Sequence, residues 1–193
     1  ASGAKLQLGF PVARIDQGED GVTVIARDGR QLSGKAAIVA LPFNILADVD
    51  FAGALGPGQQ QSAARGHDGR AVKLWLRLKG LPQGHLVTGS LGPLQWLFTP
   101  YAPVGGTILA VAFGLDDGSW HPNRRADVAA GLAKIAPQAE LIGWDWHDWC
   151  GDPFARGTWL SAPAQGADLS SATWARVGRL AFASSDIAPD AAG

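Results

Sequence analysis

The sequence has 193 residues but no methionine and only one cysteine, Cys150. A single cysteine cannot form an internal disulfide, and it offers neither a CxxC redox pair nor a thiolate zinc cluster. This usage fits a reducing compartment, so we expect a cytoplasmic protein. Because residue 1 is Ala1, we also expect the chain to begin after removal of at least one residue or by cleavage from a longer polypeptide.

An excess of charge of either sign is also absent. Sixteen Lys and Arg stand against seventeen Asp and Glu, which gives a formal net charge of −1. No basic surplus exists to neutralise a phosphate backbone or an anionic membrane, so we expect neither nucleic acid nor membrane as a partner. The 36 uncharged residues between Lys79 and Asp116 include seven Gly and four Pro, and they predict no transmembrane helix.

Four familiar site motifs do not occur in the sequence. Without GxGxxG or GxxxxGK(S/T), the chain lacks the glycine-rich turn that brings a helix N-terminus close to a pyrophosphate. Without GxSxG or HExxH, it lacks the local patterns of a serine hydrolase and a zinc protease.

The histidines do not form a metal-binding pattern. None of the four is spaced i, i+4 from another: His67, His85, His121 and His147. One segment does concentrate potential ligands: Asp145, His147, Asp148, Cys150 and Asp152. On a strand, alternation would place Asp145 and His147 on one face and Asp148 and Cys150 on the other. We therefore favour ordinary strand faces there and predict no metal.

Strands are the main elements that the pattern of apolar residues predicts. With 47% hydrophobic residues the chain can build a packed core, and residues 4–41 alternate as an antiparallel meander with a hairpin at Asp28-Gly29. This meander includes a strand over residues 5–10. The apolar run Ala36–Leu41 ends at Pro42 and predicts a strand buried on both faces.

The rest of the chain predicts more strands and two helices. In residues 71–79 the leucines fall on one face, and Lys73 and Trp75 fall on the other. We expect helices over about 59–65 and 124–135, and further strands at 94–99, 107–113, 141–149 and 178–184. The predicted class is α+β, with a mixed, mainly antiparallel sheet that has helices on one side, plus the β-meander.

Lys73 and the tryptophans are the residues most open to a functional interpretation. Lys73 sits mid-strand between apolar neighbours, either as a surface lysine with a covered stem or as an ammonium group that meets a specific partner. Eight tryptophans are many for this length; most should be core, and a few could line a pocket for flat or cationic ligands.

Four segments in order resemble flavin-containing amine oxidases. They are PVARIDQGEDGVTVIARDGRQLSGKAAIVALPFNIL, AVKLWLRLKG, DWHDWCGDPFARGTW and GRLAFASSDIAPDAAG. The first resembles the family's PV-x-x-I strand, hairpin and IVALP strand, and the second the strand with a lysine that holds a water against the flavin N5. The last two resemble its W-x-x-D-P segment and its closing turn near the flavin.

The resemblance implies a cofactor, FAD in the complete enzyme, and a role for eight residues. Lys73 is the catalytic lysine on the N5 side, and Trp159 is one wall of the aromatic cage for the amine. Cofactor-binding roles fall to Val12 near the adenine, Pro42 at the passage between layers, Trp149 near the isoalloxazine, and the turn of Ser184, Ser185 and Asp186. The turn departs from the family at Ser184, where glycine is usual.

The resemblance also implies a division of the chain. Residues 1–45 are expected to be part of the FAD-binding domain, residues 46–160 the substrate-binding domain, and residues 161–193 a truncated return to the FAD-binding domain. Since the glycine-rich segment is absent, the chain looks like a fragment that is inactive without an N-terminal half, which a second polypeptide could supply.

Two other hypotheses remain open. One is another flavin oxidoreductase of the same superfamily, such as a polyamine oxidase, an amino-acid oxidase or a desaturase. An amino-acid oxidase needs an arginine clamp for the carboxylate, for which Arg70, Arg77 and Arg156 are candidates. The other is a noncatalytic β-rich module that binds a hydrophobic ligand.

Overall fold

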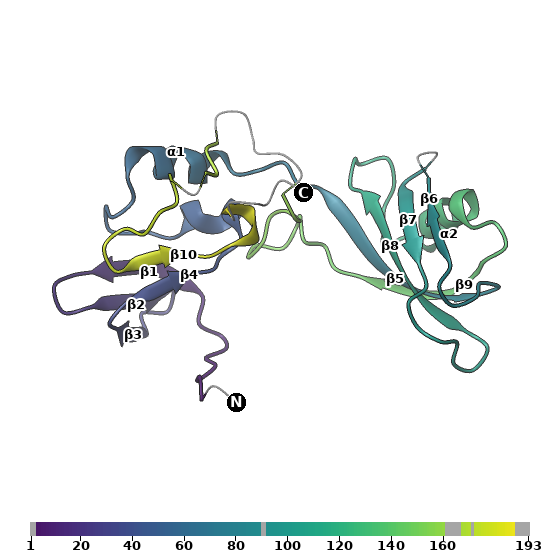
Figure 1. The fold of residues 1–193 in the computed structure, drawn as a ribbon, viewed down its shortest axis with the longest axis horizontal. Helices are drawn as coiled ribbons and strands as arrows, with labels where there is room; N and C mark the ends of the chain where they lie inside the picture. The colour runs from purple at the N-terminus through teal and green to yellow at the C-terminus, as the bar shows by residue number, and fades with distance from the viewer. Residues whose placement is uncertain (1–2, 90–91, 161–166, 171, 188–193) are drawn as a thin grey trace. The chain divides into compact units, whose positions relative to one another are not determined.

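The strand expected over residues 71–79 forms with those bounds, as β5 (Ala71–Lys79) in a five-stranded antiparallel sheet (Figure 1). The sheet order is β6-β7-β8-β5-β9. The other strands are β6 (Leu86–Thr88), β7 (Leu94–Phe98), β8 (Ile108–Leu115) and β9 (Glu140–Trp146). Because β5 pairs with β8 on one side and β9 on the other, it is the strand with two long partners.

Leucines on one face of β5 form the centre of a hydrophobic core. Leu74, Leu76 and Leu78 have no exposed surface. Helix α2 (Arg125–Ile135) packs on this face and contributes Val128, Leu132 and Ile135 to the same core. The predicted alternation of β5 and the predicted helix are therefore confirmed, together with the α+β class and its mainly antiparallel sheet.

The expected meander forms a three-stranded antiparallel sheet. Its strands are β1 (Val12–Gln17), β2 (Val22–Ala26) and β3 (Gln31–Gly34), in that order. Gly29 lies in the turn between β2 and β3 at a φ of 86°, which glycine adopts without the steric penalty of a side chain. The Asp28-Gly29 turn is therefore confirmed.

A parallel pair of strands joins distant parts of the chain. Strand β4 (Ala37–Val39) pairs with β10 (Leu180–Phe182). A 3-10 helix follows each strand, η1 (Phe43–Asp48) after β4 and η2 (Ser185–Ile187) after β10. Helix α1 (Pro57–Arg65) comes next after η1 and packs against it.

The structure, a computed structural model, describes residues 3–89, 92–160, 167–170 and 172–187. The chain forms two compact units: unit 1 consists of Ala1–Asp68 and Pro153–Gly193, and unit 2 of Gly69–Asp152. The five-stranded sheet and α2 belong to unit 2, and the other elements belong to unit 1. Over the described ranges, no helix is long and apolar enough to cross a membrane.

Two strand predictions are wrong. Residues 5–10 form no strand, and Leu6 and Leu8 are 84% and 76% exposed, because nothing in the described chain pairs with this segment. Strand β4 is not buried on both faces, since Ile38 is 73% exposed while Val39 is buried. The described residues cover only one face of β4, so its continuous apolar pattern is not matched by two packed layers.

The unit boundaries differ from the division that the family resemblance implies. The chain leaves unit 1 after Asp68 and returns at Pro153, whereas the implied functional boundaries fall after residues 45 and 160. Compactness measures which residues pack together and does not determine which ones face a cofactor. The implied division into FAD-binding and substrate-binding parts therefore stays a prediction.

The two faces of the unit 2 sheet predict different costs for the same substitution. We expect Leu76→Ala to lower the free energy of unfolding by about 2–5 kcal/mol, because it leaves a cavity in a fully buried site. Leu109→Ala, on β8 and 39% exposed, should cost less than about 1 kcal/mol. Urea unfolding measures both, and equal losses would contradict the assignment of the faces.

Candidate functional site

The face of the unit 2 sheet opposite α2 carries a cluster of aromatic rings. The Trp96 ring lies 5.2 Å from that of Phe113 and 5.9 Å from that of Phe98, with interplanar angles of 55° and 51°. The pairing of β7 with β8 sets the first contact, because Trp96 is opposite Phe113. These tilted geometries are favourable for aromatic pairs.

Lys73 joins this cluster from β5. It lies opposite Phe113 in the β5–β8 pairing. Its Nζ is 5.3 Å from the centroid of the Trp75 ring and 5.8 Å from that of Phe113, within the range of a cation–π interaction. The ammonium group is thus held near two ring faces while the lysine as a whole stays exposed.

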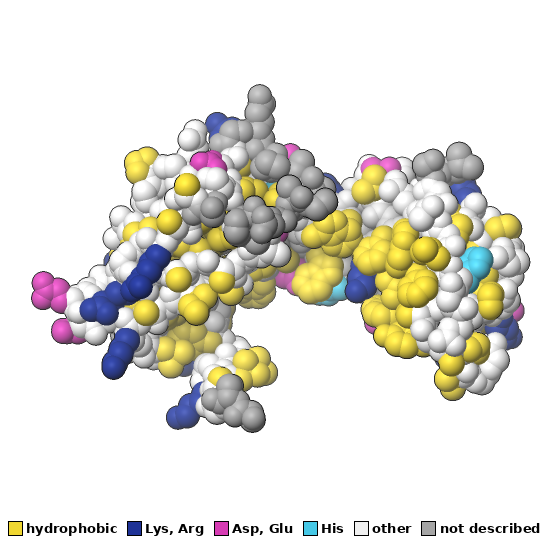
Figure 2. All heavy atoms as spheres, in the orientation of Figure 1, with side chains coloured by type: hydrophobic (Ala, Val, Ile, Leu, Met, Phe, Trp, Pro, Cys, Tyr) yellow, Lys and Arg dark blue, Asp and Glu magenta, His cyan; other side chains and the backbone are white. Residues whose placement is uncertain are grey.

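We call Lys73, Trp75, Trp96, Phe98 and Phe113 the aromatic face. The four rings are only half buried, although burial would normally stabilise such large apolar groups. Figure 2 shows hydrophobic side chains gathered over β8 in unit 2. An apolar surface with a single type of charged group is a candidate site for a ligand that is mostly apolar.

Sequence reasoning did not single out the rings that β7 and β8 contribute. The alternation in LQWLF and in ILAVAFGL places Trp96 and Phe113 on the uncovered faces of their strands. That signal was present, but it does not say which strands are neighbours. Only the order β7-β8-β5 brings Phe113 beside Lys73 and Trp96 beside Phe113.

Trp149 projects from a tight turn that follows β9 in unit 2. Its ring lies 4.3 Å from that of His147 in an edge-on arrangement, and it is 47% exposed. The His147 Nε2 atom lies 2.7 Å from Asp152 Oδ2, and the Asp148 carboxylate accepts a hydrogen bond from the Gly151 N–H. The turn therefore has its own hydrogen bonds, which leave the indole of Trp149 accessible.

A pocket of about 210 Å³ lies beside this turn within unit 2, with Trp149, Cys150 and Asp116 in its lining. Burial raises the pKa of the Cys150 thiol, Arg70 lowers it, and the Asp116 carboxylate raises it again. Arg70 and Asp116 form an ion pair at 2.7 Å. The net effect is a thiol that stays protonated to higher pH, which is the opposite of a nucleophilic cysteine.

Val12 and Pro42, two of the predicted cofactor-binding residues, line the same hollow in unit 1. This hollow of about 180 Å³ is mainly apolar, and Phe10, Leu41 and Phe154 also line it. Val12 begins β1 and Pro42 is the N-cap residue of η1, so the structure brings together residues 30 positions apart.

The predicted turn residues Ser184, Ser185 and Asp186 follow β10. Asp186 Oδ2 accepts a hydrogen bond from the Phe43 N–H at 3.2 Å, one residue after Pro42. Asp186 is buried, whereas both serines are less so. The structure thus gathers Pro42 and the turn around the start of η1.

Trp159 belongs to unit 1 and is 49% exposed in a bend. Lys73 and Trp149 belong to unit 2. The predicted site residues therefore fall into two groups, one in each unit, with Val12, Pro42, Ser184, Ser185, Asp186 and Trp159 in unit 1.

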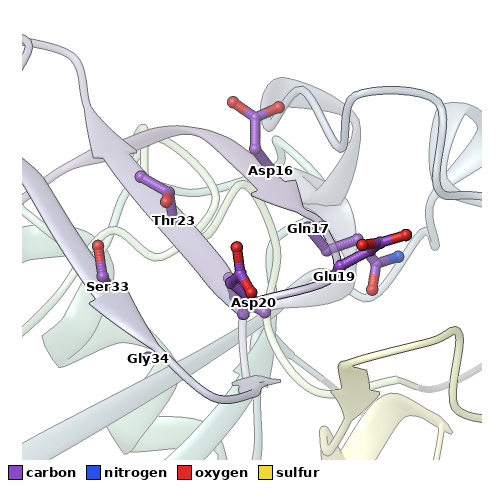
Figure 3. Close-up of a pocket in the computed structure, with 10 residues that line it drawn as sticks. Asp16, Gln17, Glu19, Asp20, Thr23, Ser33 and Gly34 are labelled. Carbon is purple, nitrogen blue, oxygen red and sulfur yellow. The ribbon is translucent and has the colours of Figure 1, made fainter.

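A more open hollow of about 410 Å³ at the end of the meander is lined by polar residues, glycines and Val22. Figure 3 shows Glu19 and Asp20 in the hairpin between β1 and β2, with Thr23 and Ser33 on adjacent strands. No buried polar group points into it to define a ligand site. Among the residues that the structure describes, no three His, Cys, Asp or Glu side chains are arranged to hold a metal ion.

The whole chain, residues 1–193, matches the model of the family described as flavin containing amine oxidoreductase. The chain belongs to this family. Membership implies FAD in the complete enzyme, and the resemblance seen in the four sequence segments is confirmed.

Individual relatives agree with this family. The chain is 30% identical to pseudooxynicotine dehydrogenase from a Pseudomonas species, over 97% of this chain and 38% of that protein. It is also 30% identical to (S)-6-hydroxynicotine oxidase from Paenarthrobacter nicotinovorans, over 95% of this chain and 43% of that protein. The chain thus spans about two fifths of the length of these relatives, as the expectation of a fragment requires.

Solved structures show the same fold. Wild-type putrescine oxidase bound to putrescine superposes with a TM-score of 0.76 at 21% identity, over 94% of this chain and 44% of that one. Cyclohexylamine oxidase from Brevibacterium oxydans gives a TM-score of 0.72 at 22% identity, over 94% of this chain and 43% of that one. At this level of identity the comparison shows the fold alone.

The surroundings of Cys150 predict how its reactivity depends on Asp116. We expect Asp116→Asn to speed alkylation of Cys150 by iodoacetamide at pH 8 by about threefold, because losing the carboxylate favours the thiolate. Asp117→Asn is the control, since Asp117 contacts Ser119 instead. Mass spectrometry follows the reaction, and equal rates in the two variants would show that Asp116 does not act on the thiol.

Proposed function

We propose that this chain is the substrate-binding portion, with adjoining FAD-facing segments, of a flavin-dependent oxidase that converts an amine to an imine. The observation that carries the proposal is the aromatic face, in which a lysine in the middle of β5 lies beside rings from two strands. This surface combines apolar area with one positive charge. It suits a ligand that is largely apolar and a cofactor that gains electron density.

The residues of unit 1 fit the ends of an FAD molecule by their chemistry. The hollow at Val12 and Pro42 is mainly apolar, as a flat adenine ring requires. The turn offers the exposed Ser185 hydroxyl and backbone groups, which suit ribityl and phosphate oxygens. In unit 2, Trp149 has an accessible indole that can lie against an isoalloxazine ring.

Bound FAD supplies the acceptor for the hydride that leaves the carbon next to the amine nitrogen. The chain's own contribution is to select and orient the substrate. The ammonium of Lys73 repels a protonated amine and so favours the neutral form, whose lone pair can assist loss of the hydride. The aromatic rings exclude water from the amine's apolar part, and the imine product is hydrolysed in water.

Oxidation of an amino acid is the second candidate. The chain is 28% identical to an L-amino acid dehydrogenase from Synechocystis, over 99% of this chain and 44% of that protein. Arg70 and Arg156 are ion-paired with Asp116 and Asp48, so they are weak candidates for a carboxylate clamp. Arg77 is exposed on the same side of β5 as Lys73, two residues from Trp75, and is the donor to test.

The family's dinucleotide-binding half, supplied by a second polypeptide or by the same one, would complete the enzyme. The test is to isolate the protein, measure the intact mass of every polypeptide in the sample, and record its absorbance. Flavin bands that bleach when an amine is added without oxygen support the proposal. A colourless protein that binds an apolar ligand but no FAD, even with the missing half present, would instead support a noncatalytic module.

Lys73→Met tests the catalytic role of the lysine in the assembled holoenzyme. We expect flavin reduction or reoxidation to slow at least about tenfold while FAD stays bound, because the positive charge is lost. Stopped-flow absorbance measures both half-reactions. Lys79→Met is the control, since Lys79 is on the same strand and face but contacts Glu140; unchanged rates in Lys73→Met would remove Lys73 from the catalytic residues.

Trp159→Ala tests the proposed wall of the amine site. We expect turnover to fall severalfold with little change in melting temperature, because the side chain is 49% exposed. Trp159→Phe should restore most of the activity. Parallel losses of melting temperature and activity in Trp159→Ala would make this residue a packing residue instead.

A further inference from the structure

Asp186 is a charged residue with an unusual degree of burial. It is only 7% exposed, in the turn that follows β10. Its Oδ2 atom accepts hydrogen bonds from the Phe43 N–H at 3.2 Å and from the Ser184 hydroxyl at 3.4 Å. The Ser184 Oγ in turn accepts from the Asp186 N–H at 3.3 Å. The carboxylate therefore points into unit 1 and ties the turn to the start of η1.

His67 approaches the same carboxylate oxygen from another part of the chain. Its side chain is 1% exposed, and its Nε2 lies 3.9 Å from Asp186 Oδ2. This distance is too long for a hydrogen bond but close enough for an ionic contact when the imidazole is protonated. The two residues are far apart in sequence, so the contact exists only in the folded unit.

The backbone of His67 is fixed by one side chain of η1. The Asn44 Oδ1 accepts from the His67 N–H at 2.7 Å, and the Asn44 Nδ2 donates to the His67 carbonyl at 3.1 Å. The preceding Gly66 has a φ of 68°, and a Cβ there would lie 2.5 Å from the Asn44 Oδ1. Glycine is therefore required for this approach, and it sets the place of the imidazole.

A buried carboxylate is costly unless donors or a cation compensate for its lost hydration. A carboxylate that served only to contact a bound cofactor would gain nothing from facing the protein interior. Here the compensating groups are the Phe43 N–H of η1, the Ser184 hydroxyl of the turn itself and the imidazole of His67. These contacts link Asp186 to the interior of unit 1, and they therefore fix the position of Ser184 and Ser185.

We propose that His67 and Asp186 act together as positioning residues that hold the turn of Ser184 and Ser185 in place for the cofactor. The statement that the turn is held for a cofactor rests on the proposed function. The proposal assigns Asp186 a role that does not require contact with FAD, and it assigns a role to His67, which the family resemblance left without one.

The test begins with the chain alone, so that it does not depend on flavin. We expect His67→Phe and Asp186→Asn each to speed hydrogen exchange of the Phe43 amide at least tenfold and to shift the NMR signals of Ser184 and Ser185. Because the two residues act as one unit, the double variant should exceed the larger single effect by less than threefold. Effects that multiply, or unchanged exchange in both single variants, would overturn the proposal.

Two further variants separate positioning from general stability. His67→Lys keeps a cationic side chain facing the Asp186 carboxylate, and we expect it to restore exchange of the Phe43 amide to within threefold of the wild type. It also serves if His67→Phe does not fold. Asp168→Ala is the matched control, because Asp168 is a carboxylate of unit 1 that bonds Ser170 and Thr173; an equal effect in this control would overturn the proposal.

The assembled holoenzyme gives a second readout. We expect His67→Phe to raise the dissociation constant of FAD at least tenfold and His67→Lys to restore it. Unchanged FAD affinity in His67→Phe would overturn the positioning role. If the wild type binds no FAD at all, the proposed function fails, whereas the exchange experiment still decides whether His67 and Asp186 hold the turn.

Discussion

The two-residue repeat of β5 is the constraint on which the unit 2 site depends. Leu74, Leu76 and Leu78 must face α2, because full burial of these side chains stabilises the core. The pleat then requires Lys73 and Trp75 to face the other way. A functional surface is thus produced by the same alternation that builds the core, and a shift of one residue in register would remove both.

In unit 1, polar contacts fix the position of the candidate site residues, whereas in unit 2 the alternation of side chains along β5 does so. The sheets of unit 1 are short. Its second segment, which begins at Pro153, contributes β10, and β10 pairs with β4. The hydrogen bonds of Asp186 lie just after β10. Hydrophobic packing alone would not define a single position for this turn. Rings nearby complete the core, with Trp174 5.2 Å from both Phe43 and Phe182.

Both units carry exposed or half-buried apolar groups. Ile38 is 73% exposed on β4, and the rings of the aromatic face are half buried on the unit 2 sheet. The chain spans 38% of one curated relative and 43% of another. Exposed apolar groups that gather on one surface are typical of a binding site, which is the role proposed above for the aromatic face.

Local pattern was a good guide wherever one segment contained the whole signal. The strand over residues 71–79, the helix ending at Ile135 and the turn at Gly29 depend on neighbouring residues, and they form as predicted. Residues 5–10 show the limit, because an alternating segment forms a strand only when another strand pairs with it.

The sequence by itself determined which side chains share a face of each strand, and through its motifs it determined the family. Only the tertiary structure decided that Phe113 lies beside Lys73 and that His67 meets Asp186. Periodicity is a property of adjacent residues, whereas these contacts depend on the order of strands and on the path of the chain between them. No local spacing contains that information.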